Sequence, residues 1–202
     1  AERYVITLGR ECGAGATYIA QHLSKELGIP YYDKDIFRMV SDKSGVLEEF
    51  FHVNSERPGN NLLYKLVKDL KPADQKPSLG KDIVSPDNLF RFQSELIREL
   101  ADNESCIIIG RCADYVLKDH DNCVHVFVCG DMDSKVQRMM HSYSLEESAA
   151  VERIKETDKQ RKKYYSYYTG GDWEAASNYD LCLNTGDMTI EEAAEQILFY
   201  LK

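Results

Sequence analysis

Apolar residues in the first part of the chain change from a strand pattern to a helix pattern and back. Tyr4 to Leu8 is a run of β-forming residues, and a glycine-rich loop follows it over residues 9–16. A helix is predicted next, because four apolar residues share one helical face: Ile19, Ala20, Leu23 and Leu27. Gly28 ends this helix, and residues 29–32 are predicted to form a second short strand.

Three further apolar runs predict strands in the second half of the chain. They are Cys106 to Ile109, Val124 to Val128 and the shorter Leu181 to Leu183. Continuously apolar runs suit central parallel strands that are covered on both faces. Thr189 and Glu192 form a capping box that begins a closing amphipathic helix. Strands that alternate with helices predict an α/β fold with a mostly parallel sheet.

The pattern is weaker between residues 33 and 85. Helical pieces are predicted near residues 35–41, 46–53 and 62–70. A clear helix signal begins again at Ser85 and Pro86, an N-cap followed by proline at the first helical position. We therefore expect a helical insert with a flexible connection in this region.

The composition is typical of a globular protein and argues against two classes, nucleic-acid binders and membrane proteins. The chain has 202 residues and a mass of 23.1 kDa, which fits one domain. A net charge of −9 and a pI of about 5.1 argue against a general nucleic-acid binder, although not against a local basic site. The apolar runs are far shorter than the roughly 20 residues of a membrane span, and the N-terminus lacks a signal-peptide pattern. We expect a cytoplasmic protein without a membrane partner.

Cysteine and histidine show no spacing typical of a metal site. The six cysteines form no C-x-x-C pair, and several lie in predicted strands, where a free cysteine acts as a small apolar residue. The five histidines lack ligand spacing as well. We interpret both sets as structural.

The glycine-rich loop is the clearest candidate for a binding site. Small residues between a first strand and a first helix let backbone N–H groups curve around an anion, and the helix N-terminus adds its own attraction. This position predicts phosphate binding, and a turn that binds nothing is the alternative. The candidate residues are Gly13, Ala14, Gly15, Ala16, Thr17 and Tyr18.

The loop departs from the common phosphate-binding pattern G-x-x-x-x-G-K-[ST] at its lysine. Ala16 occupies that position, so the ammonium that normally reaches the β- and γ-phosphates is missing. Thr17 matches the hydroxyl that ligates magnesium. Arg10 stands at the place of the first glycine and is the nearest candidate cation. Its alternative role is that of a surface arginine paired with Glu11.

A basic segment over residues 153–163 is followed by four tyrosines and a glycine pair. Its cations would repel one another in a helix unless an anion binds, and a solvated helix with offsetting acidic residues is the alternative. Arg153 and Arg161 are the best candidates for phosphate contacts, because a guanidinium can bind two oxygens. The tyrosines and glycines predict a lid that packs on the core. Stacking on single-stranded nucleic acid is disfavoured by the net charge.

Candidate groups for a second substrate follow two strands. Arg111 comes after a buried strand, at the edge where open α/β sheets bind ligands, and could clamp an acceptor phosphate. Asp114 and Asp33 could hold the rest of the acceptor. Each carboxylate could equally be a helix cap or a turn residue.

Several motifs together resemble the cytidylate kinase-like family. The motifs are Arg10 to Gly15, Leu27 to Asp33, Gly110 to Tyr115, Ile154 to Gly170 and Tyr179 to Thr185. The resemblance covers nearly the whole chain and is weakest between residues 41 and 85. It implies the P-loop fold of nucleoside monophosphate kinases, a three-layer α/β fold with a five-stranded parallel sheet, an acceptor-binding insert and a lid.

The resemblance also implies an organisation and an activity. A single domain over residues 1–202 would have its core at about 1–33, 86–140 and 178–202, its insert at about 34–85 and its lid at about 141–177. ATP would donate its γ-phosphoryl group to a nucleoside monophosphate of the CMP or dCMP type, and Mg²⁺ would bridge the phosphates. Arg10, Arg153 and Arg161 would neutralise charge. The candidates for acceptor contacts are Asp33, Arg38, Arg111, Asp114 and Asp158.

Four departures from the family pattern leave other activities open. Ala16 replaces the loop lysine, Cys112 replaces an aspartate after the Gly-Arg pair, and Thr157 replaces an arginine. The arginine expected after the second strand would align near Met39, while the available cation is Arg38. One alternative is a nucleotide-binding regulatory protein that has lost transferase activity. Another is a kinase for a different small acceptor, such as a nucleoside or a phosphorylated sugar. The sequence specifies no oligomeric state.

Overall fold

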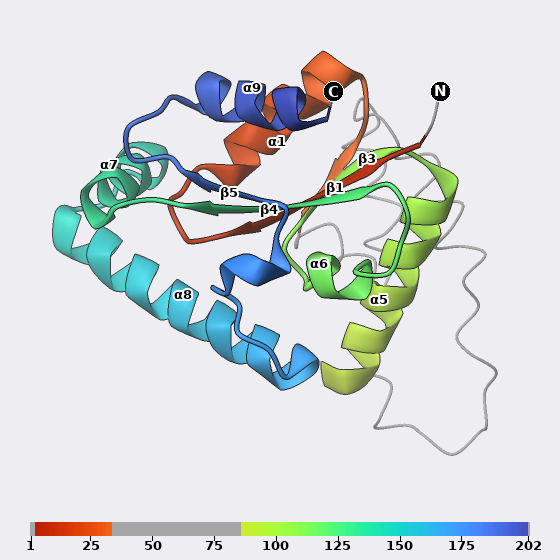
Figure 1. Cartoon of the computed structure of the whole chain (residues 1–202). Helices are drawn as coiled ribbons and strands as arrows, with labels where there is room; N and C mark the ends of the chain where they lie inside the picture. Colours follow the sequence, from red (N-terminus) through yellow and green to blue (C-terminus); the bar gives the residue numbers. More distant parts are fainter. Residues whose placement is uncertain (1–2, 34–85, 202) are drawn as a thin grey trace, which may run out of the picture.

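A parallel sheet is the centre of the computed structural model, which describes residues 3–33 and 86–201 (Figure 1). Five strands pair in the order β2-β3-β1-β4-β5, and every pairing is parallel. The strands are β1 (Val5–Arg10), β2 (Tyr31–Tyr32), β3 (Cys106–Ile109), β4 (Cys123–Cys129) and β5 (Leu181–Asn184). The predicted α/β fold with a five-stranded parallel sheet is confirmed.

Helices lie on both faces of the sheet, which makes three layers. In Figure 1, α1 and α9 cover one face, while α5, α6 and α8 lie on the other. The helices are α1 (Ala16–Leu27), α5 (Pro86–Asn103), α6 (Ala113–Val116), α7 (Met132–Tyr143), α8 (Glu147–Thr169), the 3-10 turn η1 (Ala176–Asn178) and α9 (Ile190–Tyr200). None of the helices in the described part of the chain is long and apolar enough to cross a membrane.

Alternating side chains explain why the central strands are apolar throughout. In β1, Ile6 and Leu8 belong to the core beneath α1 and α9, whereas Val5 belongs to the core beneath α5. Every residue of β3 is buried. Burial on both faces removes the polar positions that a strand exposed on one face would have.

Local signals set the ends of the helices as the sequence predicts. Gly28 ends α1 in the left-handed conformation, with φ of 65°, and its N–H donates to the carbonyl of Ser24. The capping box is present, because Thr189 and Glu192 each accept a backbone N–H of the other. These caps fix where the chain leaves one element and enters the next.

Several predictions fall outside the described residues or differ in detail. The helical pieces at 35–41, 46–53 and 62–70 lie outside them, and so does Arg38. The second strand is shorter than predicted, since only Tyr31 and Tyr32 pair with β3. The six cysteines are free thiols, and their burial ranges from the buried Cys106 to the exposed Cys182.

Candidate phosphate-binding site

The glycine-rich loop joins β1 to the first turn of α1. Gly13 and Gly15 have positive φ values of 81° and 88°, a region that strains other residues. Neighbouring atoms also leave no room for a side chain at either residue. A Cβ at Gly13 would lie 2.8 Å from the carbonyl oxygen of Lys135, and one at Gly15 would lie 2.6 Å from Cδ1 of Ile190. The loop therefore requires glycine at both positions.

The backbone of the loop offers N–H groups to a ligand. Within residues 3–33 and 86–201, the N–H groups of Gly13, Gly15, Ala16 and Thr17 donate to no protein acceptor. The N–H of Ala14 donates to the carbonyl of Glu11 at 3.3 Å. Free N–H groups at the start of a twelve-residue helix attract anions, because the helix dipole adds to their partial charge.

A cavity of about 380 Å³ opens above this loop. α1 and the loop form one side of it, and α7 and α8 supply the other. It lies at the carboxyl ends of β1 and β3, where parallel sheets place their ligands. The predicted site residues that line it are Arg10, Gly13, Gly15, Ala16, Thr17, Tyr18, Asp33, Arg153 and Arg161.

Positive charge gathers at one side of the cavity. The guanidinium of Arg10 packs against Gly110, and Arg161 donates from α8 to the carbonyl oxygen of Arg10 at 3.2 Å. Desolvation, together with the charges of Arg161 and Arg111, lowers the pKa of Arg10 to about 9. Like charges held this close oppose one another in the protein alone. An anion bound among them would remove that opposition.

Two arginines make cation–π contacts with tyrosine rings. The guanidinium carbon of Arg111 lies 4.8 Å from the ring centre of Tyr164, and that of Arg153 lies 4.4 Å from the ring centre of Tyr143. These contacts use the face of each guanidinium. Arg153 lines the cavity, whereas Arg111 is not among the residues that line it.

The turn that presents Arg111 is strained. Arg111 and Cys112 have positive φ values of 57° and 56°, directly after Gly110 at 69°. Left-handed backbone costs a residue with a side chain roughly 1–2 kcal/mol. Strain of this kind gathers at functional sites, where surrounding structure enforces it. Nε of Arg111 is also buried without a hydrogen-bond partner in the part of the chain that the structure describes.

α8 contacts the backbone of the loop through a carboxylate as well. Oδ1 of Asp158 accepts the N–H of Cys12 at 2.7 Å and lies 3.8 Å from Nη1 of Arg161. Burial raises the pKa of this carboxyl, while the Cys12 amide and Arg161 act in the opposite direction. Asp158 therefore joins α8 to the loop. Its predicted contact with substrate stays a prediction.

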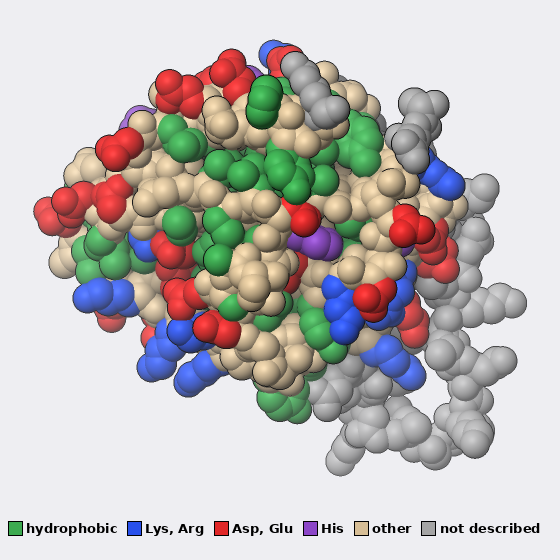
Figure 2. All heavy atoms as spheres, viewed as in Figure 1, with side chains coloured by type: hydrophobic (Ala, Val, Ile, Leu, Met, Phe, Trp, Pro, Cys, Tyr) green, Lys and Arg blue, Asp and Glu red, His purple; other side chains and the backbone are tan. Residues whose placement is uncertain are grey.

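The basic segment separates its arginines from its lysines. Arg153, Thr157 and Arg161 line the cavity at a spacing of four residues. The lysines of the helix are exposed, and Nζ of Lys162 pairs with Oε2 of Glu174 at 2.7 Å. Figure 2 shows basic side chains along the outer surface of α8. The lysines thus match the alternative of a solvated helix face, whereas the two arginines face the cavity.

Asp114 lies away from the loop cavity, in a contact between two helices. Its side chain is buried, and its Oδ2 accepts the hydroxyl of Tyr165 at 2.7 Å. Burial raises the pKa of its carboxyl, while the Tyr165 hydroxyl lowers it. The pair connects α6 to α8 and does not line the cavity. A contact between Asp114 and substrate stays a prediction.

α7 supplies cavity residues that the sequence pattern did not identify. Arg138, Ser142 and Tyr143 all line it, and the Ser142 hydroxyl lies 2.8 Å from the hydroxyl of Tyr18 on α1. Periodic apolar residues mark the buried face of α7, which could have revealed the helix. Its position beside the loop depends on the fold, so local sequence gives no signal for it.

Oxygen ligands suited to Mg²⁺ lie in the same cavity. The Thr17 hydroxyl and the Asp33 carboxylate both line it. Mg²⁺ is commonly held by one or two such groups together with substrate phosphates. Residues 3–33 and 86–201 contain no group of three or more His, Cys, Asp or Glu side chains that could hold a metal ion. These residues fit an ion that arrives with a nucleotide.

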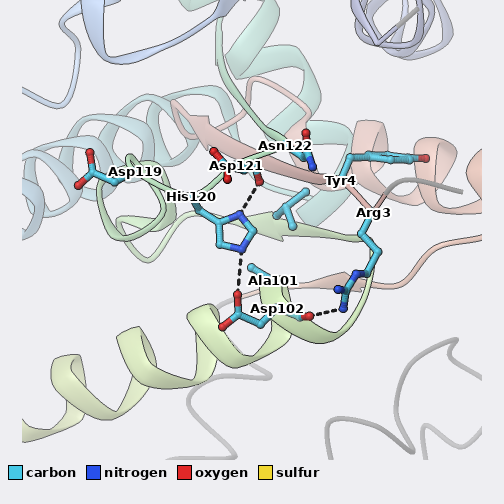
Figure 3. Close-up of a pocket in the computed structure, with 9 residues that line it drawn as sticks. Arg3, Tyr4, Ala101, Asp102, Asp119, His120, Asp121 and Asn122 are labelled. Atoms are coloured by element: carbon cyan, nitrogen blue, oxygen red, sulfur yellow. Dashed lines mark hydrogen bonds and ion pairs between the residues drawn. The ribbon is translucent and has the colours of Figure 1, made fainter.

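A second cavity, of about 360 Å³, lies at the amino ends of β1 and β4 (Figure 3). Its polar groups contact one another: Arg3 donates to the Asp102 carbonyl, and Nε2 of His120 lies 3.1 Å from Oδ1 of Asp102. Nδ1 of His120 contacts the carbonyl of Asp121 at 2.6 Å. This end of a parallel sheet is not where ligands usually bind. The loop cavity is therefore the candidate functional site.

The sheet order, the glycine loop after the first strand and the arginine-bearing helix are those of the fold of P-loop kinases. The chain belongs to the cytidylate kinase-like family, whose model matches residues 5–187. A cytidylate kinase of Methanobrevibacter smithii is 24% identical over 199 residues, which cover 98% of each chain. The resemblance to this family, predicted from the motifs, is confirmed.

Solved structures agree with this fold. An uncharacterized protein from Eubacterium ventriosum matches with a TM-score of 0.71 and 27% identity, over 98% of each chain. A shikimate kinase from Acinetobacter baumannii, solved with shikimate, matches with a TM-score of 0.52 and 15% identity, over 99% of this chain and 93% of its own. The second likeness concerns the fold alone.

Replacing Gly13 by alanine is expected to abolish most phosphate binding. The added Cβ would strain the backbone and push against the Lys135 carbonyl, which displaces the loop. We expect the Kd for ATP–Mg²⁺ to rise by at least about tenfold, which is about 1.4 kcal/mol. Gly28→Ala is the matched control, because its φ is 65° and nothing lies within 4 Å of the new Cβ. Equal ATP affinity in the two variants would contradict the prediction.

Proposed function

We propose that the protein is an ATP- and Mg²⁺-dependent kinase that phosphorylates a nucleoside monophosphate, with CMP or dCMP as the first candidates. The observation that supports this most directly is that loop N–H groups without an acceptor among the described residues meet arginine side chains around one cavity. The cytidylate kinases among the relatives favour the CMP type. Residues 34–85 would form the acceptor-binding insert, and residues 141–177 the lid.

Each part of the loop cavity has a role in this proposal. The N–H groups of Gly13, Gly15, Ala16 and Thr17 would bind the phosphates of ATP, and the Thr17 hydroxyl would contact Mg²⁺. When bound, the ion would neutralise part of the phosphate charge. Catalysis would come from alignment of the two substrates and from stabilisation of charge in the transition state.

Arginines would replace the missing loop lysine. Arg10 and Arg161 are joined through the Arg10 carbonyl and lie beside the loop, so they can face the transferred phosphoryl group. Arg111 and Arg153, each stacked on a tyrosine, are candidates for the phosphate of the acceptor. Asp33, which follows β2 and lines the cavity, is a candidate for the acceptor's sugar or base.

A coupled assay for ADP release tests the proposal. ATP–Mg²⁺ is offered with CMP, dCMP and the other nucleoside monophosphates, and with a nucleoside and a phosphorylated sugar. We expect turnover with a pyrimidine monophosphate and none without an acceptor. Turnover only with the phosphorylated sugar or the nucleoside would support a kinase activity and would contradict a nucleoside monophosphate as the acceptor. Absence of turnover with every acceptor would contradict a kinase activity of this type.

The burial of Ala16 favours a second candidate, a nucleotide-binding regulator without transferase activity. Ala16 is 3% exposed and packs in the core beneath α1 and α9, so the loop is built around a small side chain. Tight binding of ATP or ADP without turnover, unchanged by Ala16→Lys, would support the regulator. Turnover by the wild-type protein would reject it.

A further inference from the structure

Two residues from the second half of the chain contact the carbonyl groups of the glycine loop. Thr185, directly after β5, is fully buried, and its hydroxyl donates to the carbonyl oxygen of Ala14 at 2.8 Å. Arg138, from α7, donates through Nη1 to the carbonyl oxygen of Gly13 at 3.2 Å. The carbonyl groups of Gly13 and Ala14 are thus both held by side chains from outside the loop.

Arg138 also fixes the direction of the Thr185 hydroxyl. Its Nη1 donates to Oγ1 of Thr185 at 3.1 Å, and its Nη2 donates to the Thr185 carbonyl at 2.7 Å. The hydroxyl oxygen therefore accepts from Arg138, and its single hydrogen remains for a carbonyl. The Ala14 carbonyl at 2.8 Å is nearer than the Cys129 carbonyl at 3.2 Å.

Peptide geometry transmits the contact with the Ala14 carbonyl to the cavity side of the loop. In a planar trans peptide, the carbonyl oxygen of one residue and the N–H of the next point in opposite directions. A carbonyl of Ala14 held toward Thr185 therefore turns the N–H of Gly15 away from Thr185. Gly15 lines the cavity, and its N–H has no acceptor among the described residues.

We propose that Thr185, oriented by Arg138, is a positioning residue that aims the N–H of Gly15 at the bound triphosphate. The inference rests on the proposed function, because it concerns the same phosphate site. The direction of the loop N–H matters more in this chain than in a phosphate-binding loop that contains a lysine. Ala16 supplies no ammonium, so fixed backbone dipoles provide a larger share of the attraction for phosphate.

Thr185→Val tests this role, because valine keeps the shape of threonine and removes its hydroxyl. We expect the Kd for ATP–Mg²⁺, and that for inorganic triphosphate, to rise about five- to tenfold in calorimetry, the loss of one oriented hydrogen bond. KM for ATP should rise while KM for the acceptor stays within a factor of about two. Thr185→Ser keeps the hydroxyl and should restore most of the affinity.

Thr7→Val is the matched control. Thr7 is as buried as Thr185, at 1% exposure, and its hydroxyl lies 2.8 Å from Nδ1 of His125 without contact to the loop. The Thr7→Val substitution removes a hydroxyl oxygen from the core, as Thr185→Val does, so a general loss of stability would affect both variants. We expect Thr7→Val to bind ATP–Mg²⁺ as the wild-type protein does.

The outcomes separate this inference from the proposed function. Wild-type affinity for triphosphate in Thr185→Val, or an equal loss in Thr7→Val, overturns the role of Thr185 and leaves the kinase proposal intact. A wild-type protein that binds neither ATP–Mg²⁺ nor triphosphate overturns both. If circular dichroism shows Thr185→Val to be unfolded, Thr185→Ala removes the same hydroxyl with less bulk and takes its place under the same criteria.

Discussion

Arg10→Met is expected to make the protein more stable and nearly inactive. Methionine fills the space of the arginine stem without a charge, and replacing a buried charged group by an apolar one can stabilise a protein by about 1–3 kcal/mol. The same change removes a cation that faces the transferred phosphoryl group in the proposed function. We expect kcat/KM to fall by about 10²–10³, as for other preorganised charge-stabilising groups. Urea unfolding and the ADP-release assay measure the two effects.

The reason for the gain in stability is the cluster of like charges around Arg10. Within the described ranges its guanidinium forms no hydrogen bond or ion pair, while Arg111 and Arg161 lie close enough to depress its pKa. Sulfate or phosphate would stabilise the wild-type protein by binding there. The variant should gain less from the same anion, which a melting curve in phosphate buffer shows.

The advantage of Arg10→Met should depend on pH with a definite sign. Below about pH 9, Arg10 is protonated in both the folded and the unfolded wild-type chain, so the full penalty for its charge is present. Above that value the folded chain loses the proton while the unfolded chain keeps it, and wild-type stability gains relative to the variant. The difference in unfolding free energy should therefore shrink between about pH 8 and pH 10.

Arg91→Met provides the control, since Arg91 is exposed on α5 and carries the same charge. It should change neither turnover nor stability by more than about 0.5 kcal/mol. A loss of stability in Arg10→Met would show that Arg10 is held by favourable contacts. Retained turnover would show that another cation does the work of the loop lysine.

Arg161→Leu is expected to reduce turnover by about 10² or more, because it removes both a cation of the cavity and the contact with the Arg10 carbonyl. Its neighbour gives a matched comparison. Lys162→Leu removes the same charge from the same helix, but Lys162 faces solvent and pairs only with Glu174 in the described part of the chain. Exposed pairs contribute about 0–1 kcal/mol, so its turnover should change less than about twofold.

The two variants also separate a local effect from a general one. Helix propensity and net charge change equally in both, so a similar loss in both would mean that the overall charge of α8 attracts nucleotide. In that case the outward lysines, and not the cavity arginines, would be the functional groups. Steady-state kinetics with ATP varied at saturating acceptor, and then the reverse, shows which substrate Arg161 serves.

Local patterns predict the elements of this fold well, because burial on both faces leaves a clear trace in the sequence. Cys106–Ile109 could only be a central strand, and the capping box at Thr189 marks the start of α9 to the residue. The predicted second strand is two residues too long, because Ile29 and Pro30 are apolar but lie outside β2, although the Pro30 carbonyl accepts the N–H of Ile107. Apolar character shows burial and does not by itself show strand pairing.

The site was predictable only where its chemistry lies in one stretch of sequence. The loop and the arginines of α8 could be selected by spacing and charge. The link between Thr185 and Ala14 could not, because it joins residues 171 positions apart. Asp114 was selected for its charge after Arg111, but its partner Tyr165 lies on a helix whose approach only tertiary packing decides.

The contacts of Gly15 and Ala14 with residues far along the chain set an order in which the loop can take its shape. Ile190, the first residue of α9, closes against Gly15, and Thr185 holds Ala14. A growing polypeptide on the ribosome has its glycine turn long before it has the walls that shape that turn, because those walls come from residues 185 and 190. A chain interrupted before Thr185 would therefore hold the motif without the phosphate-binding shape that the proposed function requires.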